Sequence, residues 1–145
     1  MIDSNLALVT YLMQSAAIRA LVKNKVRTTL PEETLIYCGM LPQGYKPEVN
    51  GCAITFMNRG GAADPELPII RPSVQIECWA PQLASQQARK LYGAVFDQLH
   101  QKNNIDLGAV GYILSISEEV QGQDLVDPDT QWASVLSYYR LILRN

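Results

Sequence analysis

The sequence predicts an α+β fold, an antiparallel or mixed sheet of about four to five strands with helices packed mainly on one face. Apolar residues recur at helical spacing near the N-terminus and again over residues 84–99. Residues 52–57, 73–79 and 135–143 instead alternate with a period of two, which is typical of strands. The expected order of elements is α-α-β-β-α-β-β.

Length and composition are those of one globular domain. The chain has 145 residues, so we expect residues 1–145 to form a single domain. Hydrophobic residues make up 48% and charged residues 18%, which excludes a disordered chain. No apolar run approaches the ~18 residues that a membrane helix needs. The first residues lack the basic segment of a secretory signal, so the cytoplasm is the expected compartment.

Two short helices are expected at the start of the chain. Asp3 or Ser4 is the expected N-cap of the first helix, and Ser15 that of the second. Residues 25–27 and 34–37 are the strand-like pieces of the segment that follows. The rest of that segment is expected to be an extended connection, because it is rich in proline and glycine.

The centre of the chain predicts a strand, a long loop, a second strand and the strongest helix. Residues 52–57 have two fairly apolar faces, whereas residues 73–79 have one apolar and one more polar face. We expect these strands to pair antiparallel around a loop over residues 58–71. Pro81 is expected to stop the second strand, and the helix to end near residues 100–104.

Two further strands, over residues 112–116 and 135–143, complete the pattern and are joined by a polar, acidic loop over residues 121–130. In the last strand, Val135 and every second residue after it face one way, and Arg140 faces the other. Glu118 and Glu119 are expected to point to opposite faces if they belong to a strand.

Charge is unevenly distributed although the net charge is only −2 at pH 7, which is too balanced to predict general affinity for nucleic acid. Basic residues cluster early, at Arg19, Lys23, Lys25 and Arg27. Residues 103–139 contain no Lys or Arg, and their acidic residues are Asp106, Glu118, Glu119, Asp124, Asp127 and Asp129. Two interpretations of this uneven charge stay open. The basic and acidic segments are either two solvated faces or complementary surfaces that meet between subunits.

The residues predict no catalytic, cofactor or metal site. The single histidine, His100, lies at a predicted helix end, where a cation complements the helix dipole. Carboxylate pairs occur only in or near a solvated loop, and the acidic loop lacks the ligand pattern of an EF-hand. The three cysteines are too widely spaced for a ligand pair and are expected to be small core residues: Cys38, Cys52 and Cys78.

Three segments follow one another in an informative order. They are Ala16-Ala17-Ile18-Arg19-Ala20-Leu21-Val22, then Leu41-Pro42-Gln43-Gly44, then Val74-Gln75-Ile76-Glu77-Cys78-Trp79-Ala80 with Ala88 in the helix after it. In this order they resemble the tail-completion, or tail-terminator, proteins of long-tailed, siphophage-type bacteriophages, and the resemblance spans most of the chain. The sequence departs from that family by an insertion over residues 28–40 and by its acidic loop.

The resemblance implies a non-enzymatic structural protein of the virion tail, assembled in the host cytoplasm. Such proteins form a hexameric ring at the head-proximal end of the tail tube, stop tube polymerisation and join the tail to the head connector. The implied partners are further copies of the chain, the tail tube protein and head connector or adaptor proteins. DNA only passes through the lumen, and no cofactor, metal or membrane is implied.

A closed ring needs unlike faces on each subunit. We expect residues 19–27 and 118–129 to meet neighbouring subunits or rings, or the acidic loop to line the lumen. The loop over residues 58–71 is a second candidate for contact with the tube or connector, through Arg59, Gly60, Gly61 and Asp64. The alternatives are a head-side connector or adaptor, a small binding module that pairs through an exposed strand at residues 140–144, and, least favoured, an enzyme.

Overall fold

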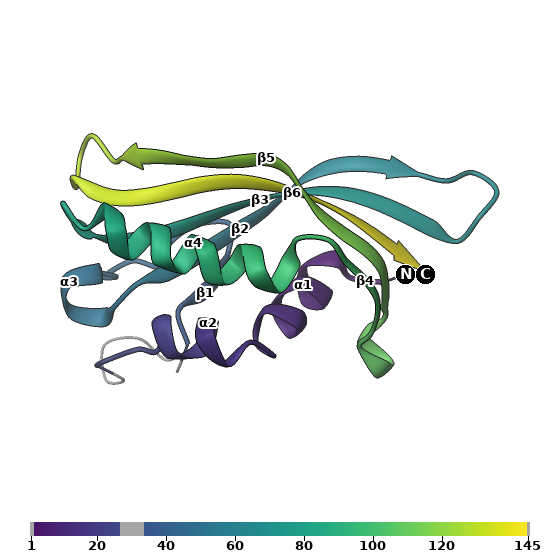
Figure 1. Ribbon diagram of the computed structural model, residues 1–145, viewed down its shortest axis with the longest axis horizontal. Coiled ribbons are helices and arrows are strands. Elements are labelled where there is room, and N and C mark those ends of the chain that lie inside the picture. Colours follow the sequence, from purple (N-terminus) through teal and green to yellow (C-terminus); the bar gives the residue numbers. More distant parts are fainter. Residues whose placement is uncertain (1, 27–33, 145) are drawn as a thin grey trace.

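The computed structural model describes residues 2–26 and 34–144, whose elements lie in two layers. A mixed sheet forms one layer, and α1, α2 and α4 cover one of its faces (Figure 1). The helices are α1 (Ser4–Leu12), α2 (Ala16–Leu21), α3 (Pro47–Asn50) and α4 (Ser85–Leu99), with one 3-10 turn, η1 (Gly108–Val110). The strands are β1 (Ile36–Cys38), β2 (Ala53–Ala63), β3 (Ile69–Gln82), β4 (Lys102–Asp106), β5 (Tyr112–Val126) and β6 (Trp132–Arg144).

The strands of the described residues are ordered β1-β2-β3-β6-β5-β4. β1 pairs parallel with β2, and every other neighbouring pair is antiparallel. β6 therefore lies inside the sheet, with Arg140 opposite Ser73 of β3 and Ser117 of β5. The expectation that residues 140–144 offer a free pairing edge is wrong, because both sides of that strand are occupied.

The general fold class is confirmed, but the number and order of elements are not. The described residues form a sheet of six strands rather than four to five, and their order is α-α-β-α-β-β-α-β-β-β. β4 was missed because it is short and polar, without alternation. β1 lies two residues later than the expected strand at residues 34–37. Residues 25 and 26 form no strand, and Arg27 lies outside the described residues.

Side-chain caps begin the first two helices, as the sequence predicted. The Asp3 carboxylate accepts the backbone N–H groups of Asn5 and Leu6, and the Ser15 hydroxyl accepts that of Ile18 at 3.2 Å. Each cap satisfies donors that have no partner within the helix. The two helices are therefore fixed by local chemistry at their starts.

α4 is the predicted amphipathic helix, and its apolar side faces the sheet. Its buried residues are Ala88, Leu91, Tyr92, Val95 and Leu99. It ends at Leu99 with His100 as its C-cap, close to the expected end near residues 100–104. Pro81 does not end the strand before it, because β3 continues to Gln82. Leu83, with a φ of 58°, makes the reversal, and the helix begins at Ser85.

Both predicted loops are largely strand. β2 continues to Ala63 and β3 begins at Ile69, so the long loop at residues 58–71 is a hairpin with a short turn. β5 likewise continues to Val126, so most of the acidic loop at residues 121–130 belongs to the sheet. Partners far along the chain fix both extensions through the sheet register, and the local sequence does not contain that information.

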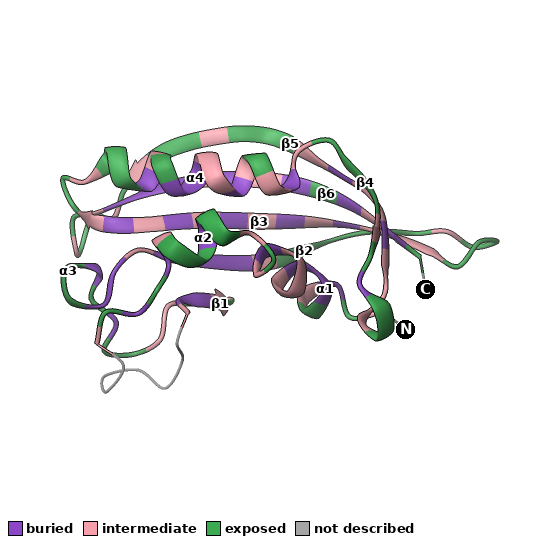
Figure 2. Ribbon diagram, turned by 60° about the horizontal axis from the view of Figure 1, so that its bottom comes forward, coloured by how far each residue is buried: buried purple, intermediate pink, exposed green. Residues whose placement is uncertain are grey.

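The core lies between the sheet and the helix layer (Figure 2). Val74, Ile76 and Cys78 of β3 are fully buried there, as are Val135 and the alternate residues after it in β6. These strand faces are as predicted. Cys78 is a core residue, but Cys52 is only partly buried and Cys38 is exposed, so the expectation of three core cysteines is wrong. No helix of the described residues is long and apolar enough to cross a bilayer.

Candidate interaction surfaces

The candidate residues that the structure describes fall on three parts of the fold: α2 and the residues after it, β5 with the turn that follows it, and the hairpin of β2 and β3. Residues 2–26 and 34–144 hold no group of three or more His, Cys, Asp or Glu side chains that could bind a metal ion. His100 stacks on Phe96 with 4.4 Å between ring centroids, and its Nδ1 accepts the backbone N–H of Glu118 at 3.1 Å. The histidine therefore holds the end of α4 against β5.

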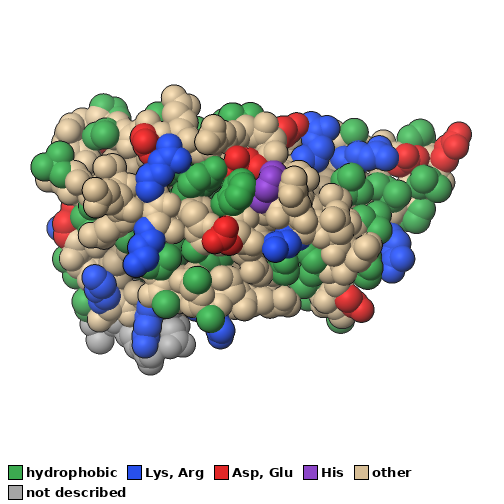
Figure 3. All heavy atoms as spheres, viewed as in Figure 1, with side chains coloured by type: hydrophobic (Ala, Val, Ile, Leu, Met, Phe, Trp, Pro, Cys, Tyr) green, Lys and Arg blue, Asp and Glu red, His purple; other side chains and the backbone are tan. Residues whose placement is uncertain are grey.

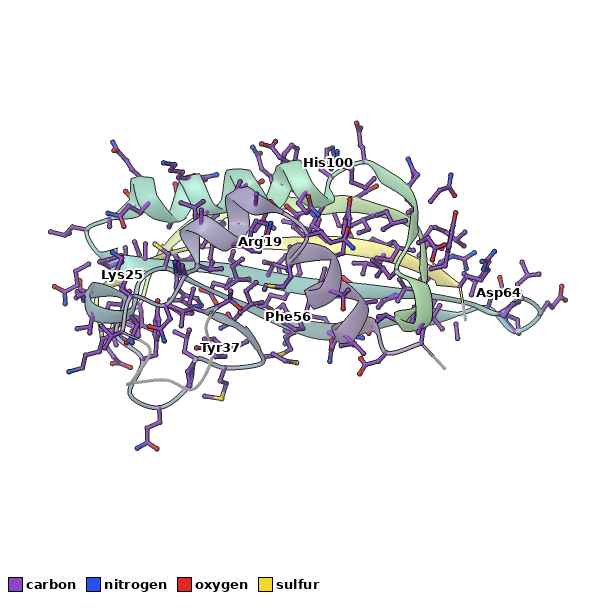
Figure 4. The ribbon with its side chains drawn as sticks, turned by 90° about the horizontal axis from the view of Figure 1, so that it is seen from below. Arg19, Lys25, Tyr37, Phe56, Asp64 and His100 are labelled. Carbon is purple, nitrogen blue, oxygen red and sulfur yellow. The ribbon has the colours of Figure 1, made fainter. Side chains whose placement is uncertain are left out.

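The described basic candidates lie on α2 and just after it, in the half of the molecule away from the hairpin of β2 and β3. Arg19 is on α2, Lys23 and Lys25 follow it directly, and all three side chains are exposed. Figure 3 shows several Lys and Arg side chains in this half of the molecule, and Figure 4 labels Arg19 and Lys25. Among the described residues, no ion pair joins these three cations to a carboxylate. Their charge is therefore available to another molecule.

A groove of about 380 Å³ opens beside these cations, between α2, α3 and the start of α4. Its lining residues are Ala20, Leu21, Lys25, Pro47, Glu48, Gly51, Cys52, Pro81, Gln87 and Lys90. Apolar side chains and prolines thus lie beside two ammonium groups and one carboxylate. We call this site the basic groove. Lys90 is not among the residues predicted from sequence, since only the fold brings α4 beside α2.

Glu118 is half-buried and has hydrogen-bond partners within the chain. It points toward the helix layer, where the hydroxyls of Tyr92 and Tyr139 both donate to its Oε2 atom. Burial, followed by the neighbouring Glu118 carboxylate, raises the pKa of both tyrosines. The two hydroxyls therefore stay protonated and serve as donors.

Glu119 and Asp124 have cationic partners within the chain. Glu119 lies on the face of the sheet opposite Glu118, as predicted, and binds Arg140 and the Ser73 hydroxyl. Asp124 pairs with Arg89 of α4 at 2.7 Å between Oδ1 and Nε. The sequence could not show these pairs, because each cation comes from another element. Both acids are thus partly neutralised before any partner arrives.

Asp127 and Asp129 lie in the turn between β5 and β6. The Asp127 carboxylate accepts the backbone N–H groups of Thr130 and Asp129, each at 2.9 Å, and these bonds lower its pKa. Asp127 therefore shapes the turn. Asp129 is exposed, and its carboxylate has no hydrogen bond or ion pair within the described residues. Of the acidic candidates in the β5 strand and turn, it is the most available to a partner.

Residues 58–72, which we call the arm, form a hairpin that projects from the body (Figure 1). The register shifts between Asn58 and Gly61, where Gly60 and Gly61 have φ angles of 91° and 149°. A Cβ on Gly61 would lie 2.1 Å from the Arg71 carbonyl oxygen, so only glycine allows the strands to approach there. Gly60 and Gly61 therefore allow the backbone conformation at the register shift where the arm begins.

Asp64 closes the turn of the arm. Its carboxylate accepts the backbone N–H groups of Glu66 and Leu67, each at 3.0 Å, and lies 3.8 Å from the Arg71 guanidinium. These hydrogen bonds are the main cause of its lowered pKa, so the side chain is ionised. Arg59 donates to the Sδ atom of Met57 at 3.6 Å. The arm is thus an ordered hairpin with a negatively charged turn.

Side chains of α4 close the outer edge of β5 beyond its pairing with β4. His100 accepts the N–H of Glu118, and the Tyr92 hydroxyl accepts that of Gly122 at 3.2 Å. Arg89 donates to the Gly122 carbonyl at 3.0 Å. These backbone groups lie where a further strand would otherwise pair.

The sheet face opposite the helices carries a hydrogen-bonded polar network and scattered apolar side chains. The Trp79 indole donates to Thr55 at 3.0 Å, and the Ser134 hydroxyl donates to Glu77 at 2.8 Å. A hollow of about 310 Å³ opens beside Trp79 and Glu77, under the exposed Met40. The alternation at residues 73–79 was the sequence signal for this half-polar face.

Replacing Glu77 with glutamine is expected to raise the free energy of unfolding at pH 7. Burial, opposed by the Ser134 hydrogen bond, raises the pKa of Glu77 above its ordinary value of 4.5. The native state thus favours the protonated carboxyl, and stability falls as pH rises from about 4.5 through the raised pKa. The gain should stay below about 1 kcal/mol, because water still reaches the group.

Urea denaturation of Glu77→Gln and the unmodified chain between pH 4 and pH 8 measures this effect. The difference in stability should grow with pH. Glu66→Gln, at an exposed position on the arm, is the matched control and should leave the pH profile unchanged. A difference for Glu77→Gln that is equal at all pH values would contradict the assignment.

Comparison with known proteins gives a fold likeness without a sequence family. No protein-family model matches the chain, and no curated protein matches it in sequence. The fold is similar to that of a chain in a solved structure described as the virion of a native gene transfer agent particle. The TM-score is 0.69 at 15% sequence identity, over 95% of this chain and 92% of the other.

Proposed function

We propose that this chain is a structural protein of a phage-like virion. The single observation that carries the proposal is the fold likeness to a chain of a gene transfer agent virion, which extends over nearly the whole of both chains. Several candidate residues also favour contacts with other proteins, since Lys25 lines an exposed groove, Asp129 lies on an exposed turn and residues 59–64 belong to the projecting arm.

Within the virion, we assign the chain to the head-proximal end of the tail tube, as a tail terminator. It forms a ring, most simply of six subunits, that stops tube polymerisation and presents a surface to the head connector. The order of the three resembling segments supports this role. The unlike ends of the molecule also support it, because a closed ring is built from heterologous contacts. DNA passes through the lumen, and neither a cofactor nor a membrane takes part.

Purified tail tube protein of the same particle, assembled with and without this chain, tests the proposal. We expect tubes seen by electron microscopy to be at least several-fold shorter when the chain is present during assembly. Multi-angle light scattering should give about six subunits, either for the chain alone or when tube protein is present.

Bovine serum albumin at the same concentration is the control for nonspecific shortening. Unchanged tube lengths, together with a monomeric or dimeric mass in both conditions, would contradict the terminator role. Co-purification with the portal or connector proteins but not with the tube would then identify a head-side adaptor.

A further inference from the structure

The arm exposes apolar surface that its own chain does not cover. Leu67, at the turn, is 55% exposed, and Pro65 and Pro68 beside it are exposed as well. The two prolines restrict the backbone around Leu67, so the side chain is displayed at little further entropic cost. Such a pre-organised apolar tip is typical of an element that inserts into another molecule.

The tip also carries two carboxylates, of which Asp64 lies beside Arg71 and Glu66 has no ion pair among the described residues. Residues 64–68 contain Asp64 and Glu66 and no basic residue. Figure 3 shows acidic side chains at the end of the projecting arm. Any surface that receives the tip must therefore offer an apolar pocket rimmed by positive charge.

The basic groove has this combination. Leu21, Pro47 and Pro81 form apolar parts of its lining, and Lys25 and Lys90 supply two ammonium groups against the single carboxylate of Glu48. Lys23 extends the positive surface into a second hollow that begins at the same residues, Ala20 and Leu21. The hollow under Met40 does not fit the tip equally well, because Glu77 is the only charged residue in its lining.

We propose that the arm of one copy of this chain docks in the basic groove of the next copy. Leu67 enters between α2 and the start of α4, and Glu66 meets Lys25 or Lys90. The partner is thus a second copy of the chain. This inference rests on the proposed function, and it names the contact from which the ring is built.

Tip and groove cannot meet within one molecule. Asp64 of the arm and Lys25 of the groove lie toward opposite ends of the long axis (Figure 4). The contact is therefore heterologous: each subunit uses its arm toward one neighbour and its basic groove toward the other. Such contacts close into a ring when each added subunit is rotated by the same fixed angle.

Cysteine cross-linking tests the contact directly. In a background of Cys38→Ser and Cys52→Ser, one tagged variant carries Leu67→Cys and a second, differently tagged, carries Gln87→Cys. Both positions are exposed, so both variants are expected to fold. We mix the two with tail tube protein, add a short bismaleimide, and expect a covalent dimer containing both tags. Leu6→Cys, 51% exposed on α1, replaces Leu67→Cys in the control and should give at least tenfold less dimer.

Charge exchange gives a second readout. Glu66→Lys or Lys25→Glu alone should lower the yield of cross-linked dimer about three- to tenfold, and the two changes in opposite partners should restore it. The same exchange is made with Lys90→Glu, and no restoration with either lysine variant would contradict the charge pairing in the proposed contact.

The outcomes separate the contact from the function. A species of about six subunits without the Leu67–Gln87 cross-link would overturn the arm contact and leave the terminator role standing. Cross-linking of Leu67→Cys to the tube protein instead would overturn it by assigning the arm another partner. Failure of both assembly and cross-linking would overturn both proposals.

Discussion

Replacing Tyr139 with alanine is expected to lower the free energy of unfolding by about 3–5 kcal/mol, as for other large aromatic residues in cores. Tyr139 is fully buried in β6, opposite Val74 of β3 and Glu118 of β5. Truncation would leave a cavity between the sheet and α4. It would also remove the hydroxyl that donates to Glu118 at 3.3 Å.

The neighbouring residue is the matched control for Tyr139. Tyr138 belongs to the same strand but points to the face without helices, where it is only partly buried. Its replacement by alanine should cost only about 1–2 kcal/mol. Tyr139→Phe, which removes only the hydroxyl, should cost about 1 kcal/mol. Urea denaturation measures all three, and equal losses for Tyr138→Ala and Tyr139→Ala would show that the core does not lie on the helix side.

Two glycine-to-alanine changes should have opposite signs. A Cβ on Gly122 would lie 2.7 Å from Cζ of Tyr92 and 2.8 Å from Cγ1 of Val135. Gly122→Ala is therefore expected to lower the free energy of unfolding by about 1–3 kcal/mol through overpacking. A Cβ on Gly93, within α4, would meet nothing within 4 Å, so Gly93→Ala should raise stability by up to about 1 kcal/mol.

Thermal unfolding followed by circular dichroism compares the two variants with the unmodified chain. The shift in midpoint should be downward for Gly122→Ala and upward for Gly93→Ala. Neither position has the positive φ that would penalise alanine on its own, so the sign reports packing alone. A neutral result at Gly122 would mean that Tyr92 moves freely, against its hydrogen bonds to Glu118 and Gly122.

The features predicted from sequence are those determined by near neighbours. Asp3 and Ser15 cap helices through N–H groups two or three residues away, and the spacing of Leu91, Val95 and Leu99 reflects one turn of helix. The polar β4 and the outer half of β2 depend on pairing with residues further along the chain. A strand that is stabilised mainly by its partner has little signal of its own.

The candidate surfaces likewise include some features that the local sequence predicts and others that depend on distant residues. Exposure of the early basic cluster followed from its sequence, and the structure places Arg19, Lys23 and Lys25 at the surface. The acidic segment proved less uniform, because Glu119 and Asp124 bind arginines from β6 and α4, which no local pattern indicates. The basic groove needs three helices to meet. Only the arrangement of those helices could identify Lys90 as part of it.

Closure of the β5 edge by side chains of α4 and by His100 limits how the backbone of another chain can pair with this sheet. The backbone at Glu118 and Gly122 is already satisfied, so an unfolded or half-assembled neighbour gains nothing by aligning a strand against it. Beside it, β4 is only five residues long and carries the charged residues Lys102 and Asp106. A short, charged edge strand disfavours edge-to-edge pairing with other chains. Edge-to-edge strand pairing of the kind found in amyloid is thus disfavoured at this border. A contact made at this border must then use side chains, which discriminate between partners where backbone amides do not.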